Sequence, residues 1–157
     1  MIRPILTIPH PALHRRTHEV RDPRSRETQS LIADLKETCV AALGMGLAAP
    51  QVGILDRVIV VHYPTNGEPD ALVNPEVVWT STATSVLEEG CLSIPNIIVP
   101  VRRPRKVRIR ALSENGEPIE RLAGNLLAKI LQHEIDHLNG VLITDYQSSP
   151  TPAPLEA

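Results

Sequence analysis

The residues with the clearest chemical potential lie near the C-terminal end of the sequence, in the segment His133-Glu134-Ile135-Asp136-His137. Two histidines four positions apart lie on the same face of a helix, because an α-helix turns by about 100° per residue. Such an HExxH segment presents two imidazole nitrogens to one metal ion, and its glutamate can reach a water on that metal. The pattern predicts a hydrolytic metal site with His133 and His137 as ligands and Glu134 as general base.

The surrounding sequence suits such a helix, which we expect over about residues 123–138. Leu126 and Ile130 share a stripe with the two histidines, within an arc of roughly 60° on a helical wheel. Asn139-Gly140 then supplies the residues that commonly end a helix. The two aliphatic side chains would therefore form an apolar wall beside the metal.

A catalytic metal of this kind needs a third protein ligand and an open position for water. In metzincin proteases a third histidine follows the glycine that matches Gly140, but this chain has Ile143 there. Farther downstream the candidate carboxylates are Asp145, expected at a strand end, and Glu156 in the tail. We therefore expect the third ligand upstream, where Cys91 offers a thiolate. A single cysteine is also typical of a small buried hydrophobic residue.

The composition restricts the classes of protein to which the chain can belong. Its 157 residues, 42% hydrophobic and 22% charged, are typical of one globular domain. The net charge of −2 lacks the basic excess that binds phosphate backbones, so we expect no sequence-specific nucleic-acid binding. No run approaches the roughly 18 apolar residues of a membrane helix, and the start lacks a secretory pattern. We expect a cytoplasmic protein that does not bind membranes.

Hydrophobic periodicity predicts helices and a hairpin-rich sheet in one domain over residues 1–146, and the composition of residues 147–157 predicts a disordered tail. An N-terminal helix is expected over about residues 25–43. The basic run at residues 102–106 is interpreted as a solvated sheet edge. The predicted strands are 58–61, 71–73, 77–79 and 107–112, with a short returning strand after the turn at 114–117.

Three motifs occur in order along the chain: GMGLAAPQ at 44–51, EGCLS at 89–93 and QHEIDH at 132–137. Together they resemble the three signature motifs of the peptide deformylases, and the resemblance extends from about residue 5 to residue 146. It implies an α+β fold in which antiparallel β-sheets pack around a central HExxH helix, with an N-terminal helix. It also implies removal of the N-terminal formyl group from formyl-Met of nascent polypeptides, with release of formate.

The resemblance also implies roles for residues of the three motifs. Cys91 and the two histidines of the third motif would hold one divalent metal ion, and Glu134 would be the general base. Gln51 and the backbone N–H of Leu92 would stabilise the oxyanion. The implied ion is Fe²⁺ in the cell, with Ni²⁺, Co²⁺ or Zn²⁺ as substitutes, all compatible with one thiolate and two imidazoles.

The substrate would be held by backbone pairing and by an apolar pocket. Gly46 matches the family position whose backbone pairs with the peptide as an added strand would. Leu126 and Ile130, from the helical wheel, and Leu87, from the resemblance alone, are expected to contact the methionine side chain. The predicted partners are thus formyl-Met nascent peptides.

The chain departs from some relatives at a few positions. Asn125 stands where relatives often have glycine, and asparagine tolerates a similar backbone. Ile98 lies near a position where some relatives carry an arginine that holds the peptide, so we expect strand pairing, with help from Arg102 or Arg103, to hold it here. The sequence lacks the C-terminal helix linked to ribosome docking in some bacterial members, which leaves a transient ribosome contact as an open expectation.

Two other classes of function remain open from the residues. An HExxH metallopeptidase would use the same helix to cleave peptide bonds, although Ile143 and the upstream Cys91 argue against it. A non-catalytic relative that binds peptide or metal would have no need of Glu134.

Overall fold

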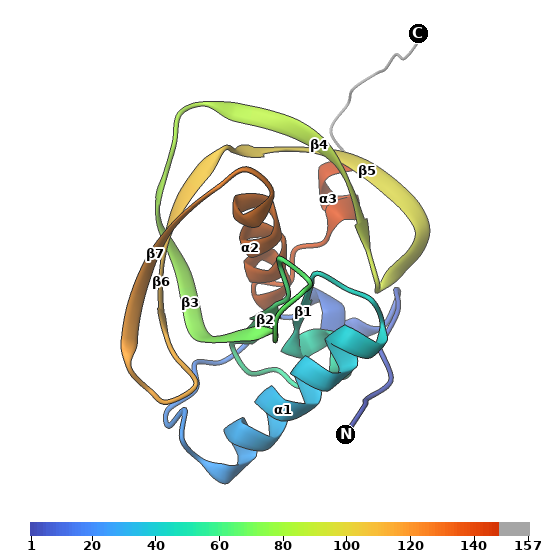
Figure 1. The fold of residues 1–157 in the computed structure, drawn as a ribbon. Coiled ribbons are helices and arrows are strands. Elements are labelled where there is room, and N and C mark those ends of the chain that lie inside the picture. The colour runs from blue at the N-terminus through green and yellow to red at the C-terminus, as the bar shows by residue number, and fades with distance from the viewer. Residues whose placement is uncertain (148–157) are drawn as a thin grey trace, which may run out of the picture.

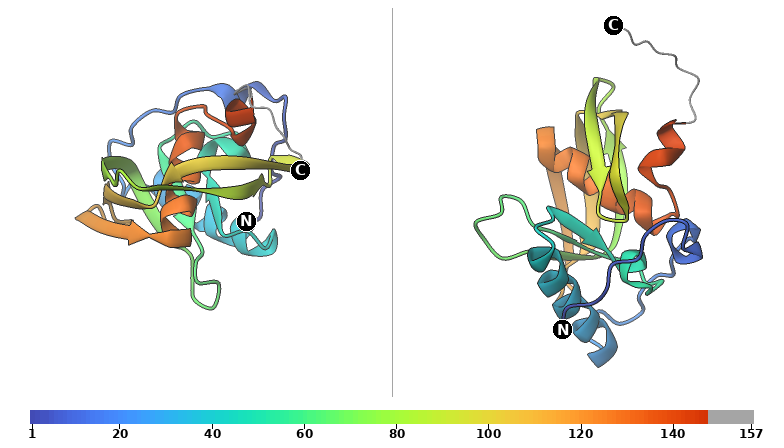
Figure 2. Two further views of the ribbon diagram at one scale, coloured as in Figure 1. Left: turned by 90° about the horizontal axis from the view of Figure 1, so that it is seen from above. Right: turned by 90° about the vertical axis from the view of Figure 1, so that its right-hand side faces the viewer.

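The structure is a computed structural model that describes residues 1–147. It contains two antiparallel β-sheets and two long helices, and among the described residues no helix is long and apolar enough to cross a membrane (Figures 1 and 2). The predicted tail over residues 147–157 lies outside the described residues apart from Gln147, which belongs to a short helix. The expectation of antiparallel sheets with a few helices is confirmed.

The larger sheet has five strands in the order β1-β2-β3-β6-β7, and the smaller sheet pairs β4 with β5. The expected strand at 58–61 and the hairpin after residue 107 are confirmed. β4 and β5 form a long hairpin that the sequence analysis did not identify. The strand bounds are β1 Gly46–Ala48, β2 Val58–Val61, β3 Asp70–Thr80, β4 Thr84–Cys91, β5 Ile94–Pro104, β6 Lys106–Leu112 and β7 Pro118–Gly124.

The two strands predicted at 71–73 and 77–79 are one continuous strand, β3, so this part of the prediction is wrong. Asn74, with φ of 51°, lies at the irregularity, and the pairing with β6 shifts register between Val73 and Glu76. The Asn74 side chain accepts a hydrogen bond from the N–H of Val20 at 2.8 Å and donates to its carbonyl at 2.9 Å. The strand therefore continues through a local bend where the sequence suggested a break.

The helices are α1 Arg26–Ala41, α2 Asn125–Leu138 and α3 Ile143–Gln147, with 3₁₀ turns η1 Pro11–His14 and η2 Ala49–Val52. Ser25 caps α1, since its side chain accepts a hydrogen bond from the N–H of Thr28. Asn125 begins α2 with φ of 53°, a conformation that asparagine tolerates. Asp145 lies in α3 and not at a strand end, which corrects the sequence-based expectation.

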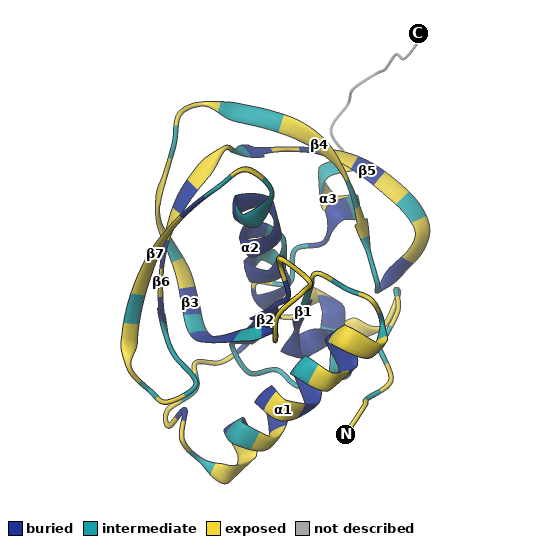
Figure 3. Cartoon of the chain, in the orientation of Figure 1, coloured by how far each residue is buried: buried dark blue, intermediate teal, exposed yellow. Residues whose placement is uncertain are grey.

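The apolar run of β2 is buried on both faces because a helix covers each face of the larger sheet. Ile59 and Val61 belong to the core cluster that includes α2, whereas Val58 and Val60 belong to the cluster that includes α1. In Figures 1 and 3, α2 lies between the larger sheet and the β4-β5 hairpin, and its surface is largely buried. In this position α2 is shielded from water along most of its length.

The C-terminal end of α2 is fastened to the N-terminal arm. The carbonyl of Leu138 accepts hydrogen bonds from the backbone N–H of Thr17 at 2.9 Å, from its hydroxyl at 2.8 Å, and from Arg57 Nη1 at 3.1 Å. Gly140 follows with φ of 75°, and a β-carbon there would lie 2.8 Å from the carbonyl oxygen of His14. These contacts fix the last turn of α2.

Candidate metal centre

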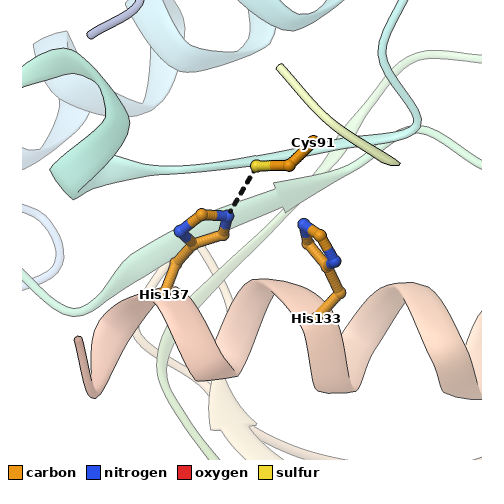
Figure 4. A group of neighbouring side chains, drawn as sticks. All are labelled: Cys91, His133 and His137. Carbon is orange, nitrogen blue, oxygen red and sulfur yellow. Dashed lines mark hydrogen bonds between the residues drawn. The ribbon is translucent and has the colours of Figure 1, made fainter. Parts of the chain in front are cut away.

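Three side chains that can bind a metal meet between α2 and the end of β4 (Figure 4). His133 and His137 lie one turn apart on α2, and Cys91 is the last residue of β4. Their ligand atoms all lie within 4.8 Å of one another, and Cys91 Sγ is 3.4 Å from His137 Nε2. Two such ligands of one tetrahedral ion are about 3.5 Å apart, from metal–sulfur and metal–nitrogen bonds of about 2.3 and 2.05 Å. The three residues therefore fit one divalent metal ion.

The two histidines differ in their electrostatic surroundings. Although burial lowers it, the pKa of His133 is raised to about 10 by Cys91, Glu89 and Glu134. Burial, with the charges of His133 and Arg103, lowers the pKa of His137 well below its usual range, which keeps its imidazole neutral. A neutral imidazole is the form that binds a metal, so His137 is ready to bind one, whereas His133 would release its proton as a metal binds.

The orientation of His133 is set by Glu89, to which the sequence analysis gave no role. His133 Nδ1 and Glu89 Oε1 are 3.0 Å apart, which leaves Nε2 of His133 for a metal. Glu89 also accepts hydrogen bonds from Arg103 Nε at 2.7 Å and from Arg103 Nη2 at 2.9 Å. Burial raises the pKa of Glu89, but the hydrogen bonds from His133 and Arg103 outweigh this effect and lower it to about 2. Glu89 is thus an ionised carboxylate that is held in place next to His133, one of the predicted ligands.

Arg103 is buried, which corrects its interpretation as part of a solvated sheet edge and as a candidate for holding the peptide. It is 3% exposed, and its Nη1 donates to Asp136 at 2.8 Å, while the Tyr146 hydroxyl donates to the same carboxylate oxygen at 2.7 Å. One signal in the sequence could have indicated this position. Arg103 has the same parity along β5 as Val99 and Val101, which face the core.

The carboxylate of Glu134 is buried beside the three ligand side chains. Burial raises its pKa to about 7, and among the described residues Oε1 has no hydrogen-bond partner. Gly46 of β1 makes this position possible, because a β-carbon at residue 46 would lie only 2.6 Å from Glu134 Oε2. A carboxylate with a free oxygen and a pKa near neutrality is suited to proton transfer.

Gln51 extends from η2 toward Cys91 and is 2% exposed. Its Oε1 accepts a hydrogen bond from the N–H of Ala48 at 3.0 Å, and its Nε2 donates to Ser93 Oγ at 3.0 Å. The same Nε2 lies 3.8 Å from Cys91 Sγ, so the amide presents its donor side to the metal centre. Leu92 follows Cys91 in the turn between β4 and β5.

The predicted site residues other than His137 line one cavity of about 600 Å³. His137 lies behind this cavity and is 1% exposed. A second hollow of about 650 Å³ includes Arg57 and Asp136 in its lining but none of the three candidate ligands. The predicted residues that line the first cavity are Gly46, Gln51, Leu87, Cys91, Leu92, Leu126, Ile130, His133 and Glu134.

Comparison with known proteins gives one consistent result. The family model for polypeptide deformylase matches residues 2–153. A peptide deformylase of Phenylobacterium zucineum is 45% identical over 150 residues, which cover 94% of this chain and 88% of the relative. A crystal structure of a peptide deformylase from Legionella pneumophila is similar with a TM-score of 0.90 and 40% identity, covering 95% of this chain and 88% of that one.

A structure of a peptide deformylase from Acinetobacter baumannii, described as bound to Met-Ala-Ser, is similar with a TM-score of 0.85 and 33% identity. The match covers 92% of this chain and 98% of that chain. With this motif content, this fold and this coverage, the chain belongs to the polypeptide deformylase family.

Proposed function

We propose that this chain removes the formyl group from the N-terminal formyl-Met of nascent polypeptides, using one divalent metal ion held by Cys91, His133 and His137. Family membership supports the activity and the use of a divalent metal. The observation that carries the assignment of residues is the position of Glu134, whose buried carboxylate lines the same cavity as two of the candidate ligands. A purely structural metal site would not require this carboxylate.

The substrate would enter the cavity with its formyl group at the metal centre. Leu126 and Ile130, one turn apart on α2, and Leu87 of β4 form the wall that we assign to the methionine side chain. Gly46 lies in β1, which is one of the two edge strands of the larger sheet. An extended peptide can pair with such an edge, and the Met-Ala-Ser complex of the relative is consistent with a peptide substrate.

The bound ion would lower the pKa of a water ligand toward 7 and polarise the formyl group. Glu134 takes a proton from the attacking water while the water oxygen bonds to the formyl carbon. Gln51 Nε2 and the N–H of Leu92 donate hydrogen bonds to the negative charge that develops on the formyl oxygen. Glu134 then gives the proton to the amine nitrogen as the carbon–nitrogen bond breaks, which yields formate and a free methionine amine.

The finer assignments belong to the same proposal. We assign Fe²⁺ as the ion used in the cell, with Ni²⁺, Co²⁺ and Zn²⁺ as substitutes, since thiolate and imidazole ligands accept all four. Residues 1–146 act as one catalytic domain with the HExxH helix as its central element. Because nascent polypeptides carry the substrate group, we place the activity in the cytoplasm, with transient contact at the ribosome.

The test is formate release from formyl-Met-Ala-Ser by protein purified without oxygen and loaded with Fe²⁺ or Ni²⁺, beside Glu134→Gln. We expect turnover in the original protein and a loss of at least about 100-fold in the variant, the usual effect of removing a general base. Metal content, measured for both proteins, should be equal.

Acetyl-Met-Ala-Ser is the matched peptide for the metallopeptidase alternative. Cleavage of that peptide without formate release from the formylated one would favour a peptidase. Absence of turnover in protein that verifiably contains metal would favour a peptide-binding relative.

A further inference from the structure

The turn that ends α1 gives Leu43 an unfavourable backbone conformation. The N–H of Gly44 donates to the carbonyl of Cys39 at 3.0 Å, and the N–H of Leu43 donates to the carbonyl of Val40 at 3.1 Å. These two bonds define a Schellman motif, in which the residue at the position of Leu43 is usually glycine. Leu43 has φ of 57°, in the left-handed region that strains a side chain with a β-carbon.

The side chain of Leu43 gains little packing in return for this strain. It is 92% exposed, so its apolar surface remains in contact with water. A glycine or an asparagine would satisfy the same backbone at lower cost. Strain of this kind at the edge of a functional cavity calls for an explanation in terms of function.

Leu43 is part of an apolar rim at the mouth of the metal cavity, which we define as Leu43, Met45 and Ile98. All three line that cavity, and Met45 and Ile98 are 43% and 58% exposed. They come from two separate elements, the α1-β1 connection and β5 (Figure 1). A peptide that leaves the cavity between these elements would cover the exposed apolar surface.

Short contacts place both parts of the rim next to the metal centre. A β-carbon added to Gly44 would lie 3.0 Å from Leu92 Cδ1, so the α1-β1 connection touches the turn that follows Cys91. A β-carbon added to Gly90 would lie 3.3 Å from Ile98 Cδ1, so the Ile98 side chain lies over the residue that precedes Cys91. Both parts of the rim therefore adjoin the segment from Gly90 to Leu92, which carries Cys91.

The charges around the rim are unfavourable to an acidic substrate side chain. Glu88 lines the cavity and is exposed. Among the described residues that line this cavity, Lys129 is the only lysine or arginine. Its ammonium donates to the carbonyl of Ser85 at 2.7 Å and the residue is 4% exposed, so this cation is held inside the fold and not on the exposed rim.

We propose that the apolar rim selects the substrate residues that follow formyl-Met, favouring apolar side chains and disfavouring acidic ones. This inference rests on the proposed function, since it takes the methionine to lie on the wall of Leu126 and Ile130. The second and third residues of the peptide then pass the rim and Glu88 on their way out. Burial of Leu43 against the substrate explains why a leucine occupies a position suited to glycine.

The first test compares kcat/KM for two series of peptides, formyl-Met-X-Ser and formyl-Met-Ala-X, with X as leucine, serine or aspartate. We expect leucine to exceed aspartate by about 10-fold or more in at least one series, the size of effect that an apolar contact gives in an enzyme pocket. Serine should lie between them. Formate release with equal kcat/KM for all three would overturn this inference and leave the proposed function standing, whereas no release from any peptide would overturn the proposed function.

The second test uses variants of the rim. Leu43→Gly keeps the Schellman motif. Both Leu43→Gly and Ile98→Ser should lower the ratio of kcat/KM for the leucine peptide to kcat/KM for the aspartate peptide by at least about 3-fold, mainly through KM. Glu88→Lys should raise kcat/KM for the aspartate peptide, and the gain should shrink in high salt. Leu122→Ser is the matched control, because Leu122 is also 58% exposed in a strand but does not line the cavity. A ratio that stays unchanged in both rim variants would contradict the inference.

Discussion

Gly46 and Glu134 lie against each other in the metal cavity, so closely that a β-carbon on residue 46 would fall 2.6 Å from Glu134 Oε2 and 2.9 Å from Glu134 Cγ. The contact joins the edge strand β1 to the helix that carries the HExxH segment. Residue 46 therefore determines where the proposed general base can lie, in addition to any pairing with the substrate.

Gly46→Ala should displace the Glu134 carboxylate while leaving the protein folded, because the atoms that must move, the carboxyl group and Cγ, belong to a side chain and not to the backbone. We expect kcat for formyl-Met-Ala-Ser to fall about 100-fold, as a misplacement of about 1 Å can cause. Metal content should be unchanged. Gly67→Ala is the control, since a β-carbon there meets no atom within 4 Å, and full activity in Gly46→Ala would refute the constraint.

Arg103→Lys should weaken metal binding although Arg103 is not a candidate ligand. The lysine cannot reproduce the paired hydrogen bonds to Glu89, so His133 would lose its fixed orientation. Loss of such a supporting contact typically lowers metal affinity 10–100-fold. Competition with a chelator measures the affinity, and Arg108→Lys on the exposed face of β6 should leave it unchanged. Equal affinities in the two variants would show that Glu89 holds His133 without Arg103.

The two cysteines should differ in their reaction with iodoacetamide once metal is removed. Burial, with a smaller contribution from Glu134, raises the pKa of Cys39 to about 12, so its thiol stays protonated at pH 8 and reacts slowly. Cys91, which we assign as a ligand, should be protected by metal and become reactive after chelation. Mass spectrometry of the labelled peptides identifies the modified residue.

The rate at Cys39 should rise with pH up to about 12, because only its thiolate reacts. Cys91→Ser is the control and should abolish the rapid phase. Equal labelling of Cys91 with and without metal would exclude it as a ligand.

Leu43→Gly should stabilise the protein even though it weakens substrate selection. Glycine removes the strain of the left-handed conformation at residue 43, but it also raises the backbone entropy of the unfolded chain. The free energy of unfolding should therefore increase by about 1 kcal/mol. For a domain of this size, Tm should rise by about 2–4 °C. Asn96→Gly is a suitable comparison, because Asn96 has φ of 67° but asparagine tolerates this region, so its gain should be smaller. A lower Tm for Leu43→Gly would mean that Leu43 packs more tightly than its exposure indicates.

The elements that the sequence predicted well are those whose pattern depends on local contacts. The HExxH helix was expected over about residues 123–138 and spans Asn125–Leu138, because its apolar and polar stripes repeat with the helical period. The N-terminal helix was expected two residues too long at its C-terminal end, where Leu43 occupies a position that usually carries glycine.

The β4-β5 hairpin was missed because its residues do not alternate clearly between apolar and polar. Val86 and Leu87 are consecutive exposed apolar residues in β4. The hydrogen-bond partners of Arg103 could not be predicted, for a different reason. Its partners Glu89 and Asp136 are 14 and 33 positions away, so their meeting depends on the tertiary fold and not on spacing in the sequence. The same holds for Gly46 beside Glu134.

The hydrogen bonds on the Leu138 carbonyl join residues 121 positions apart, one in the N-terminal arm and one next to His137. The last turn of α2 is therefore completed by Thr17, which is synthesised long before this helix and must wait for it to leave the ribosome. Contacts over such sequence separations slow folding. A growing copy of this protein consequently cannot bring Cys91 together with the two histidines of α2 until that helix has been made.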